Sequence, residues 1–87
     1  MLYSVTMNGV IQMHDVVALL EDVPARHFDS NRPLLLKRGQ MGTVVMTHPG
    51  GVFEIEFSGQ DGKAYALLPI KSEKLIVLRD SPELASA

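Results

Sequence analysis

The chain has 87 residues, no cysteine, eight Lys and Arg residues and ten Asp and Glu residues, for a formal net charge of -2. This length supports one hydrophobic core, and the lack of cysteine excludes disulfides and thiolate metal ligands. The near-balanced charge lacks the basic excess with which a non-specific nucleic-acid binder neutralises phosphates. We therefore expect one compact domain whose partner is not primarily nucleic acid.

The two ends of the chain are expected to lie outside this domain. Residues 1–12 have neither the basic start nor the long apolar run of a secretion signal, and no segment has the roughly 20 apolar residues of a membrane span. We expect a cytoplasmic protein with no membrane partner. We interpret 1–12 as an N-terminal extension, either an extra edge strand or a start upstream of the domain. The predicted domain covers 13–79, and 80–87 is predicted to be a flexible tail.

The first half of the chain contains one predicted strand and one predicted loop. Segment 14–21 is a compact apolar run that closes before Pro24, and its length and paired valines favour a strand over a helix. Residues 22–38 contain two prolines and the turn formers of 29–31. We predict a long irregular loop there, between the first two strands, and loops of that length in compact domains are often functional.

The second half predicts two hairpins. Residues 43–46 and 52–57 are predicted strands on either side of a Pro-Gly-Gly reversal at 49–51. The second of these strands alternates three apolar with two acidic side chains, in the order Phe53, Glu54, Ile55, Glu56 and Phe57. This period of two predicts that the apolar set faces the core and the glutamates face water.

The remaining elements complete a familiar pattern. Asp61-Gly62 favours a tight turn, 64–68 is the next strand, 69–74 is polar enough for a 3₁₀ turn, and 75–78 is the last strand. Five short strands, a long first loop, two tight hairpins and a 3₁₀ turn before the last strand are typical of a small all-β, five-stranded SH3-like barrel.

No group of residues indicates catalysis or metal binding. The histidines, His14, His27 and His48, have no ligand-pair spacing. Glu54 and Glu56 share one outward strand face that Lys63 can reach, which is an unsuitable place for an acid–base pair. The chain also has no nucleophile-elbow motif. We expect a protein that is not an enzyme and that has no cofactor and no metal.

The candidate partner-binding residues lie mainly in the predicted loop. They combine cationic, aromatic and aliphatic side chains, as protein interfaces do: Arg26, His27, Phe28, Arg32, Leu35 and, on a later strand, Tyr65. The alternative is that Phe28 and 34–36 fill one end of the barrel. Tyr65 is either part of the barrel wall or an aromatic residue of a binding groove.

Three segments carry a family resemblance. They contain Asp15-Val16-Val17, then Gly39-Gln40-Met41-Gly42-Thr43-Val44, then Tyr65-Ala66-Leu67. In this order they resemble a small bacterial family of domains of unknown function, DUF4926, over roughly residues 13 to 78. The resemblance implies an SH3-like fold and brings no established activity or catalytic residues. The middle segment is also similar to the glycine-containing turn of ribosome-associated KOW barrels. The stretch from Arg26 to Pro33 and the N-terminal extension depart from the family pattern.

These observations favour a small, non-catalytic protein-interaction module that acts as a monomer or weak homodimer. Its size, acidic balance and lack of catalytic residues suit an inhibitory or accessory partner, of the antitoxin or immunity type, for a protein encoded beside it. The alternative is an RNA-binding or ribosome-associated barrel that uses Lys37, Arg38 and Lys63. Such a barrel would bind RNA with an affinity that falls steeply with salt.

Overall fold

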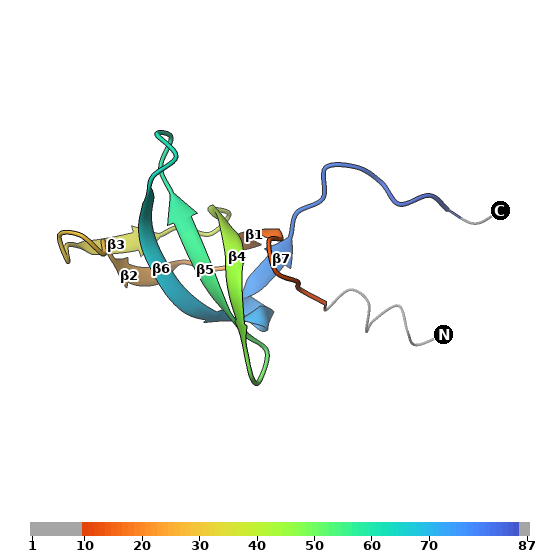
Figure 1. The fold of residues 1–87 in the computed structure, drawn as a ribbon, viewed down its shortest axis with the longest axis horizontal. Helices are drawn as coiled ribbons and strands as arrows, with labels where there is room; N and C mark the ends of the chain where they lie inside the picture. The colour runs from red at the N-terminus through yellow and green to blue at the C-terminus, as the bar shows by residue number, and fades with distance from the viewer. Residues whose placement is uncertain (1–9, 86–87) are drawn as a thin grey trace.

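The computed structural model describes residues 10–85, which form an all-β domain (Figure 1). Its elements, in chain order, are β1 (Val16–Leu19), β2 (Val23–Arg26), β3 (Pro33–Leu36), β4 (Met41–His48), β5 (Val52–Ser58), β6 (Ala64–Lys71), the 3₁₀ turn η1 (Ser72–Lys74) and β7 (Leu75–Val77). Five strands form one antiparallel sheet in the order β6-β5-β4-β1-β7, and β2 and β3 form a separate hairpin. The all-β prediction is confirmed, with seven strands in place of five.

The described residues at the two ends of the domain lack regular secondary structure. Residues 10–12 and 80–85 are in neither strand nor helix. The part of the predicted N-terminal edge strand that falls on 1–9 lies outside the described residues, as do 86–87 of the predicted tail. Across 10–85, no helix has the length and apolar character to cross a membrane.

The apolar part of the alternation in β5 is confirmed, whereas Glu54 and Glu56, predicted to face water, are half-buried. Ile55 and Phe57 are 0% and 1% exposed, and Phe53 packs against the same core while half-buried. β5 lies between β4 and β6, and buried side chains of both neighbours belong to the same cluster as Ile55 and Phe57. The core of the domain therefore forms on one face of the five-stranded sheet.

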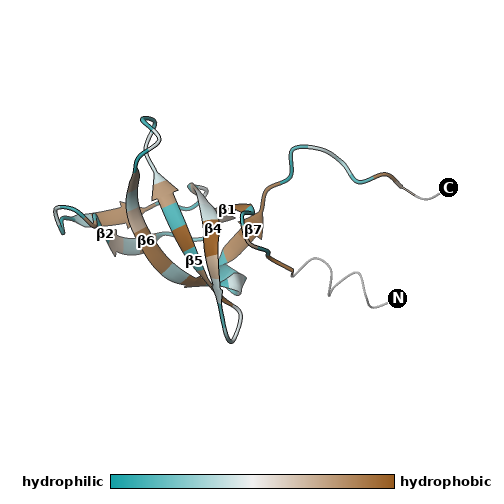
Figure 2. Ribbon diagram, in the orientation of Figure 1, coloured by the Kyte–Doolittle hydropathy of each residue, from teal (hydrophilic) through white to brown (hydrophobic). Residues whose placement is uncertain are grey.

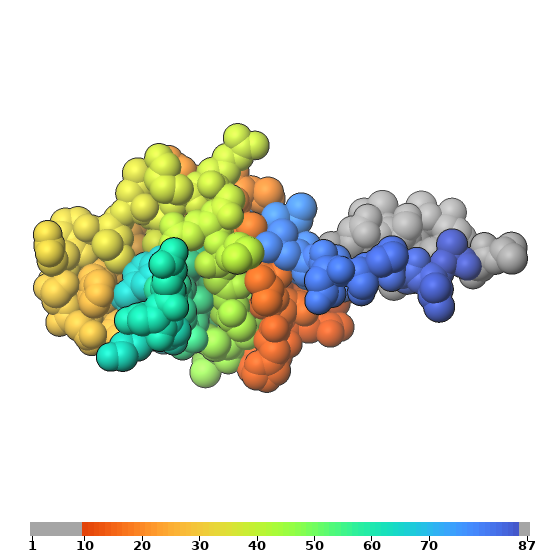
Figure 3. Space-filling view, turned by 90° about the horizontal axis from the view of Figure 1, so that it is seen from above, coloured from red at the N-terminus to blue at the C-terminus, as the bar shows by residue number. Residues whose placement is uncertain are grey.

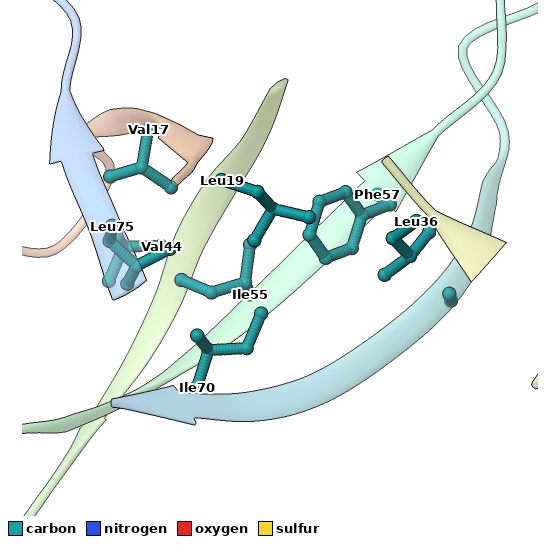
Figure 4. Close-up of a cluster of buried hydrophobic side chains, with 9 residues drawn as sticks. Val17, Leu19, Leu36, Val44, Ile55, Phe57, Ile70 and Leu75 are labelled. Carbon is teal, nitrogen blue, oxygen red and sulfur yellow. The ribbon is translucent and has the colours of Figure 1, made fainter. Parts of the chain in front are cut away.

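The buried cluster draws on every strand except β2 (Figure 4). Its fully buried members are Val17, Leu19, Leu36, Val44, Ile55, Phe57, Ala66, Ile70 and Leu75. Leu36 of β3 is the one buried member of this cluster that lies outside the five-stranded sheet. Through Leu36, the hairpin packs against the core face of the sheet. Figure 2 shows teal positions between the brown, hydrophobic positions of β5.

The second glycine of the Gly-x-x-Gly segment, Gly42, is required by the close packing of β5 against β4. A Cβ at this position would lie 2.6 Å from Ile55 Cγ2 and 3.0 Å from Phe57 Cε1. Only glycine leaves room for the aromatic ring of β5 to pack against β4 at this point. The first glycine, Gly39, has a φ of 90°, so it serves the β3–β4 turn instead.

The prediction of an irregular loop over 22–38 is wrong, because this stretch contains the β2–β3 hairpin. The His27 N–H donates to Arg32 O, so these two residues form a hydrogen-bonded pair of the hairpin. Counted from this pair, every second residue along each strand points its backbone N–H and C=O toward the other strand. Pro24 and Pro33 fall on the other positions, where the nitrogen points away from the partner strand. The two prolines therefore cost the hairpin no ladder hydrogen bond.

The predicted 3₁₀ turn over 69–74 is too long. β6 continues to Lys71, and only Ser72–Lys74 forms the turn. The Ser72 N–H donates to Gly51 O, so the alternation along β6 turns the nitrogen of Pro69 away from β5. A proline at an outward-facing position of an edge strand is compatible with the sheet, which is why it does not end β6.

The hairpin and the sheet do not form one continuous ladder. Among the described residues, one backbone hydrogen bond joins them, from the Phe28 N–H to Tyr65 O at 2.9 Å. The domain is elongated, 52 × 28 × 20 Å, with the yellow hairpin at one end and the blue segment 80–85 at the other (Figure 3). The described strands thus form an open sheet with a hairpin against it, and barrel closure is not seen.

Candidate functional site

The tip of the hairpin is a compact turn held by His27. The backbone N–H groups of Asp29 and Ser30 both approach His27 Nδ1, at 3.2 and 3.4 Å. The Asn31 N–H donates to His27 O, and Asn31 has a φ of 60°, which asparagine tolerates better than most residues. The imidazole is therefore part of the scaffold of the turn.

Tyr65 joins the hairpin to the sheet. It is the extra residue of a β-bulge, because Ser58 pairs with Ala64 and Phe57 with Ala66. Its ring stacks on His27 with centroids 6.3 Å apart, and its hydroxyl accepts a hydrogen bond from the side-chain amide of Gln40. Tyr65 is half-buried against the core, so it supports the hairpin and offers little free surface.

The two faces of the hairpin have different roles. Leu36 is buried, and Leu34, Val23 and Ala25 pack partly buried against the core. Leu35 lies opposite Pro24 on the other face and is 54% exposed. The structure therefore divides the three consecutive leucines, with two on the core and one directed to solvent.

Four of the six predicted partner-binding residues, Arg26, Phe28, Arg32 and Leu35, are exposed on the hairpin. Phe28, at the tip, is 55% exposed, and its ring centroid lies 6.2 Å from that of His27. Arg26 is exposed and donates to Asn31 O at 2.9 Å. We call hairpin surface the exposed side chains of Pro24, Arg26, Phe28, Arg32, Pro33 and Leu35.

The hairpin surface carries positive charge without local carboxylate partners. The ion pairs among residues 10–85 involve neither Arg26 nor Arg32. Phe28 and Leu35 thus lie on the same hairpin as two guanidinium groups that have no ion-pair partner in the described part of the chain. Such a surface matches a partner segment that combines apolar and acidic side chains.

The basic residues of the nucleic-acid alternative come from two different turns. Lys37 and Arg38 lie between β3 and β4, and Lys63 lies between β5 and β6. The Lys37 ammonium is 3.5 Å from the Asp22 carboxylate. The backbone N–H of Arg38, more than the nearby charges of Lys37 and Arg38, lowers the pKa of Asp22. Part of the positive charge at this turn is therefore compensated locally.

The other titratable residues have structural contacts. His48 Nε2 lies 2.7 Å from Glu54 Oε1, across the β4–β5 pair. His14 has a φ of 71°, and its N–H donates to Val44 O just before β1. Among residues 10–85, no three His, Asp or Glu side chains come together as a metal ion would require.

A second apolar surface was missed by the sequence reasoning. The side of the sheet away from the core exposes five large apolar side chains on β1, β4 and β7 or directly beside them: Val16, Leu20, Met41, Ile76 and Leu78. The signal was the adjacent apolar pairs Val16-Val17, Leu19-Leu20 and Ile76-Val77. A strand with neighbouring apolar residues has apolar side chains on both faces, so one of them is left uncovered unless something packs on it.

The comparisons with known proteins give one match. The model of a domain of unknown function, DUF4926, matches residues 13–77, which include all seven strands. No curated protein and no solved structure matches the chain. Since the matched region covers most of the sequence, the chain belongs to the DUF4926 family.

Proposed function

We propose that this chain is a small, non-catalytic protein-interaction module that binds its partner through the hairpin surface. The observation that carries this proposal is the exposure of Phe28 and Leu35, at 55% and 54%, on a hairpin whose opposite face packs on the core. Burying aromatic and aliphatic side chains against a partner is a main source of binding free energy.

The hairpin is held in place before any partner arrives. Leu36 anchors β3 in the core, the Phe28 N–H is bonded to Tyr65 O, and His27 stacks on the Tyr65 ring. A preorganised loop loses less conformational entropy on binding than a mobile one. This rigidity supports a recognition role for the hairpin tip.

The chemistry of the partner follows from the side chains on offer. Phe28 and Leu35 require an apolar contact, and Arg26 and Arg32 favour carboxylates at its rim. We propose an inhibitory or accessory role toward a neighbouring protein that presents such a segment. The small size of the chain, its net charge of -2 and its lack of catalytic motifs support this role.

The test is a comparison of three versions of the full chain. We expect wild type to retain a specific protein from a lysate of its source organism, and Phe28→Ser with Leu35→Ser to lose it. Met46→Ser is the matched control, since Met46 is also 54% exposed but lies on β4. All three should give the same far-UV circular dichroism spectrum. Equal capture by all three versions contradicts the hairpin as the binding site.

Nucleic acid is the outcome that would replace this proposal. The capture is therefore repeated after nuclease treatment and in about 0.5 M salt, where contacts to phosphates weaken by orders of magnitude. We expect the partner protein to remain. Loss of the partner in both conditions, with RNA retained at low salt, would favour the surface formed by Lys37, Arg38 and Lys63.

We also propose that the family fold is a variant of the SH3-like barrel. The strand order β6-β5-β4-β1-β7, the excursion after the first strand and the 3₁₀ turn before the last strand support this relation. The Phe28–Tyr65 backbone bond supports closure between hairpin and sheet. An experimental structure in which the hairpin stands away from β6 would contradict it.

A further inference from the structure

The outer edge of β7 has backbone groups without a partner strand. β7 is the last strand of the sheet, and its one neighbour is β1. The bonds from the Leu78 N–H to Val16 O and from the Leu20 N–H to Lys74 O place even-numbered residues in the bonded pairs with β1. Leu75 and Val77 therefore direct their backbone groups outward.

These outward groups remain available to another strand. The Leu75 N–H caps η1 through Ser72 O, but within residues 10–85 no hydrogen bond involves Leu75 O, Val77 N–H or Val77 O. A hollow of about 470 Å³ runs along this edge, lined by Ile11, the residues of β7, Glu73 and Arg79. The edge thus has both free hydrogen-bonding groups and space beside them.

The charges at the two ends of β7 are complementary to each other under twofold symmetry. Glu73 precedes the strand, Arg79 follows it, both are exposed, and neither forms an ion pair among the described residues. In an antiparallel pairing of two β7 strands centred on Ile76, the end that carries Glu73, in the turn η1, meets the partner's end that carries Arg79. By symmetry the other two ends meet in the same way, so both ends of the pairing are complementary.

Neighbouring registers lack this match. Centring the pair on Leu75 or on Val77 would slide one strand past the other by two residues, about 7 Å, and would move Glu73 away from the partner's Arg79. Of these three registers, the one centred on Ile76 aligns the oppositely charged ends. It also allows each Val77 N–H to donate to the partner's Leu75 O, and the two Ile76 side chains meet at the closely spaced pair on the axis.

We propose that a second copy of this chain occupies the β7 edge, in an antiparallel dimer centred on Ile76. The partner in this pairing is specified by charge complementarity and by the free backbone groups, and it is independent of the hairpin surface. A three-residue edge strand gives a small contact, so the dimer forms reversibly at high protein concentration.

The first test introduces a charge on the axis. Ile76→Lys places two ammonium groups face to face, and sedimentation velocity should show self-association weakened about tenfold or more. Leu67→Lys is the matched control, since Leu67 is also 49% exposed but lies on β6, near the other edge of the sheet. The control should associate as wild type does. A wild-type chain that stays monomeric at millimolar concentration overturns the proposal, as does equal association of all three versions.

The second test uses charge reversal and does not depend on the stability of one variant. Glu73→Arg alone and Arg79→Glu alone each create two like-charge pairs and should weaken association about tenfold. An equimolar mixture of the two variants restores both opposite-charge pairs in a heterodimer, so its association should return to within about twofold of wild type. A mixture that associates no better than its two components contradicts the register.

The third test reads the backbone directly. In the proposed dimer the Val77 amide is hydrogen-bonded to the partner's Leu75 O, so its hydrogen exchange should slow as wild-type protein concentration rises. In Ile76→Lys the exchange should be fast and independent of concentration. Slow Val77 exchange that is the same at every concentration would show that a segment of the same chain, and not a second copy, pairs with this edge. That result would contradict the proposed dimer.

Discussion

The β4–β5 pair and the β2–β3 hairpin are both antiparallel, yet the alternation of buried and exposed side chains is visible in the sequence of the first and hidden in that of the second. In β5, glutamates alternate with apolar residues, so the pattern marks which side is buried. In the hairpin, three consecutive leucines and two prolines conceal the same alternation of buried and exposed positions. The difference teaches that a strand with apolar side chains on both faces hides its period, and that its outer face is then available for binding.

The largest expected effect is a difference in stability between alanine variants of two phenylalanines, one from each region. Phe57→Ala should lower the free energy of unfolding by about 3–5 kcal/mol, because a 1% exposed ring is removed from a packed core. Phe28→Ala, at 55% exposure, should change it by less than about 1 kcal/mol. Urea unfolding followed by circular dichroism measures both. Equal losses would mean that the hairpin tip is as much a part of the core as β5.

The next effect tests the close packing of β4 on β5. Gly42→Ala should lower the free energy of unfolding by about 1–3 kcal/mol, because its Cβ would clash with Ile55 and Phe57. Gly59→Ala is the control, since its Cβ would meet only the end of the Asp61 side chain, at 3.2 Å. Thermal unfolding of both variants should show a clear shift for Gly42→Ala only. A neutral Gly42→Ala would contradict the proposed reason for this glycine.

A smaller effect concerns the contact that ties the hairpin region to the sheet. Tyr65→Phe removes the hydroxyl that accepts a hydrogen bond from Gln40 but keeps the ring that stacks on His27. We expect a loss of about 0.5–1.5 kcal/mol in the free energy of unfolding. In the Gln40→Ala background the same substitution should cost less, because the partner is already gone. An additive double variant would show that the two side chains do not interact.

The smallest effect is a dependence on pH at the β3–β4 turn. The Arg38 N–H and the neighbouring positive charges lower the pKa of Asp22 in the folded chain. The ionised carboxylate thus stabilises the fold above its unfolded-state pKa of about 3.9, and this contribution is lost as pH falls through the lower folded-state value. An NMR titration should place the Asp22 midpoint below that of an unfolded peptide. Asp22→Asn should reduce the loss of stability between pH 7 and pH 3 more than Asp29→Asn, a charge-matched control at the hairpin tip.

The sequence was sufficient for the part of the fold in which polarity alternates. The core positions of β5, the turn at Pro49 and the Asp61-Gly62 turn follow from local residue chemistry. The hairpin did not follow, because a proline is tolerated wherever its nitrogen points away from the ladder, and that depends on the register between strands. The register of a hairpin is set by the turn that joins its strands, and the turn formers at 29–31 do not by themselves specify one register.

The candidate site was predictable only in part, because the exposure of its residues also depends on how the strands pair and pack. Phe28 and Leu35 were identified from composition, whereas their exposure depends on which face of the hairpin packs on the core. The structural role of Tyr65 depends on a bulge and on Gln40, 25 residues away in the sequence. The β7 edge depends on strand order, which no local pattern encodes.

The most direct test of this account is a comparison of two adjacent leucines of β3. Leu36 is 2% exposed and Leu35 is 54% exposed, although they have the same side chain and neighbour each other in one strand. By urea unfolding, Leu36→Ala should lower the free energy of unfolding by about 2–5 kcal/mol and Leu35→Ala by no more than about 0.5 kcal/mol. Equal losses, or a larger loss for Leu35→Ala, would show that the hairpin presents its other face to the core and would contradict the proposed binding surface.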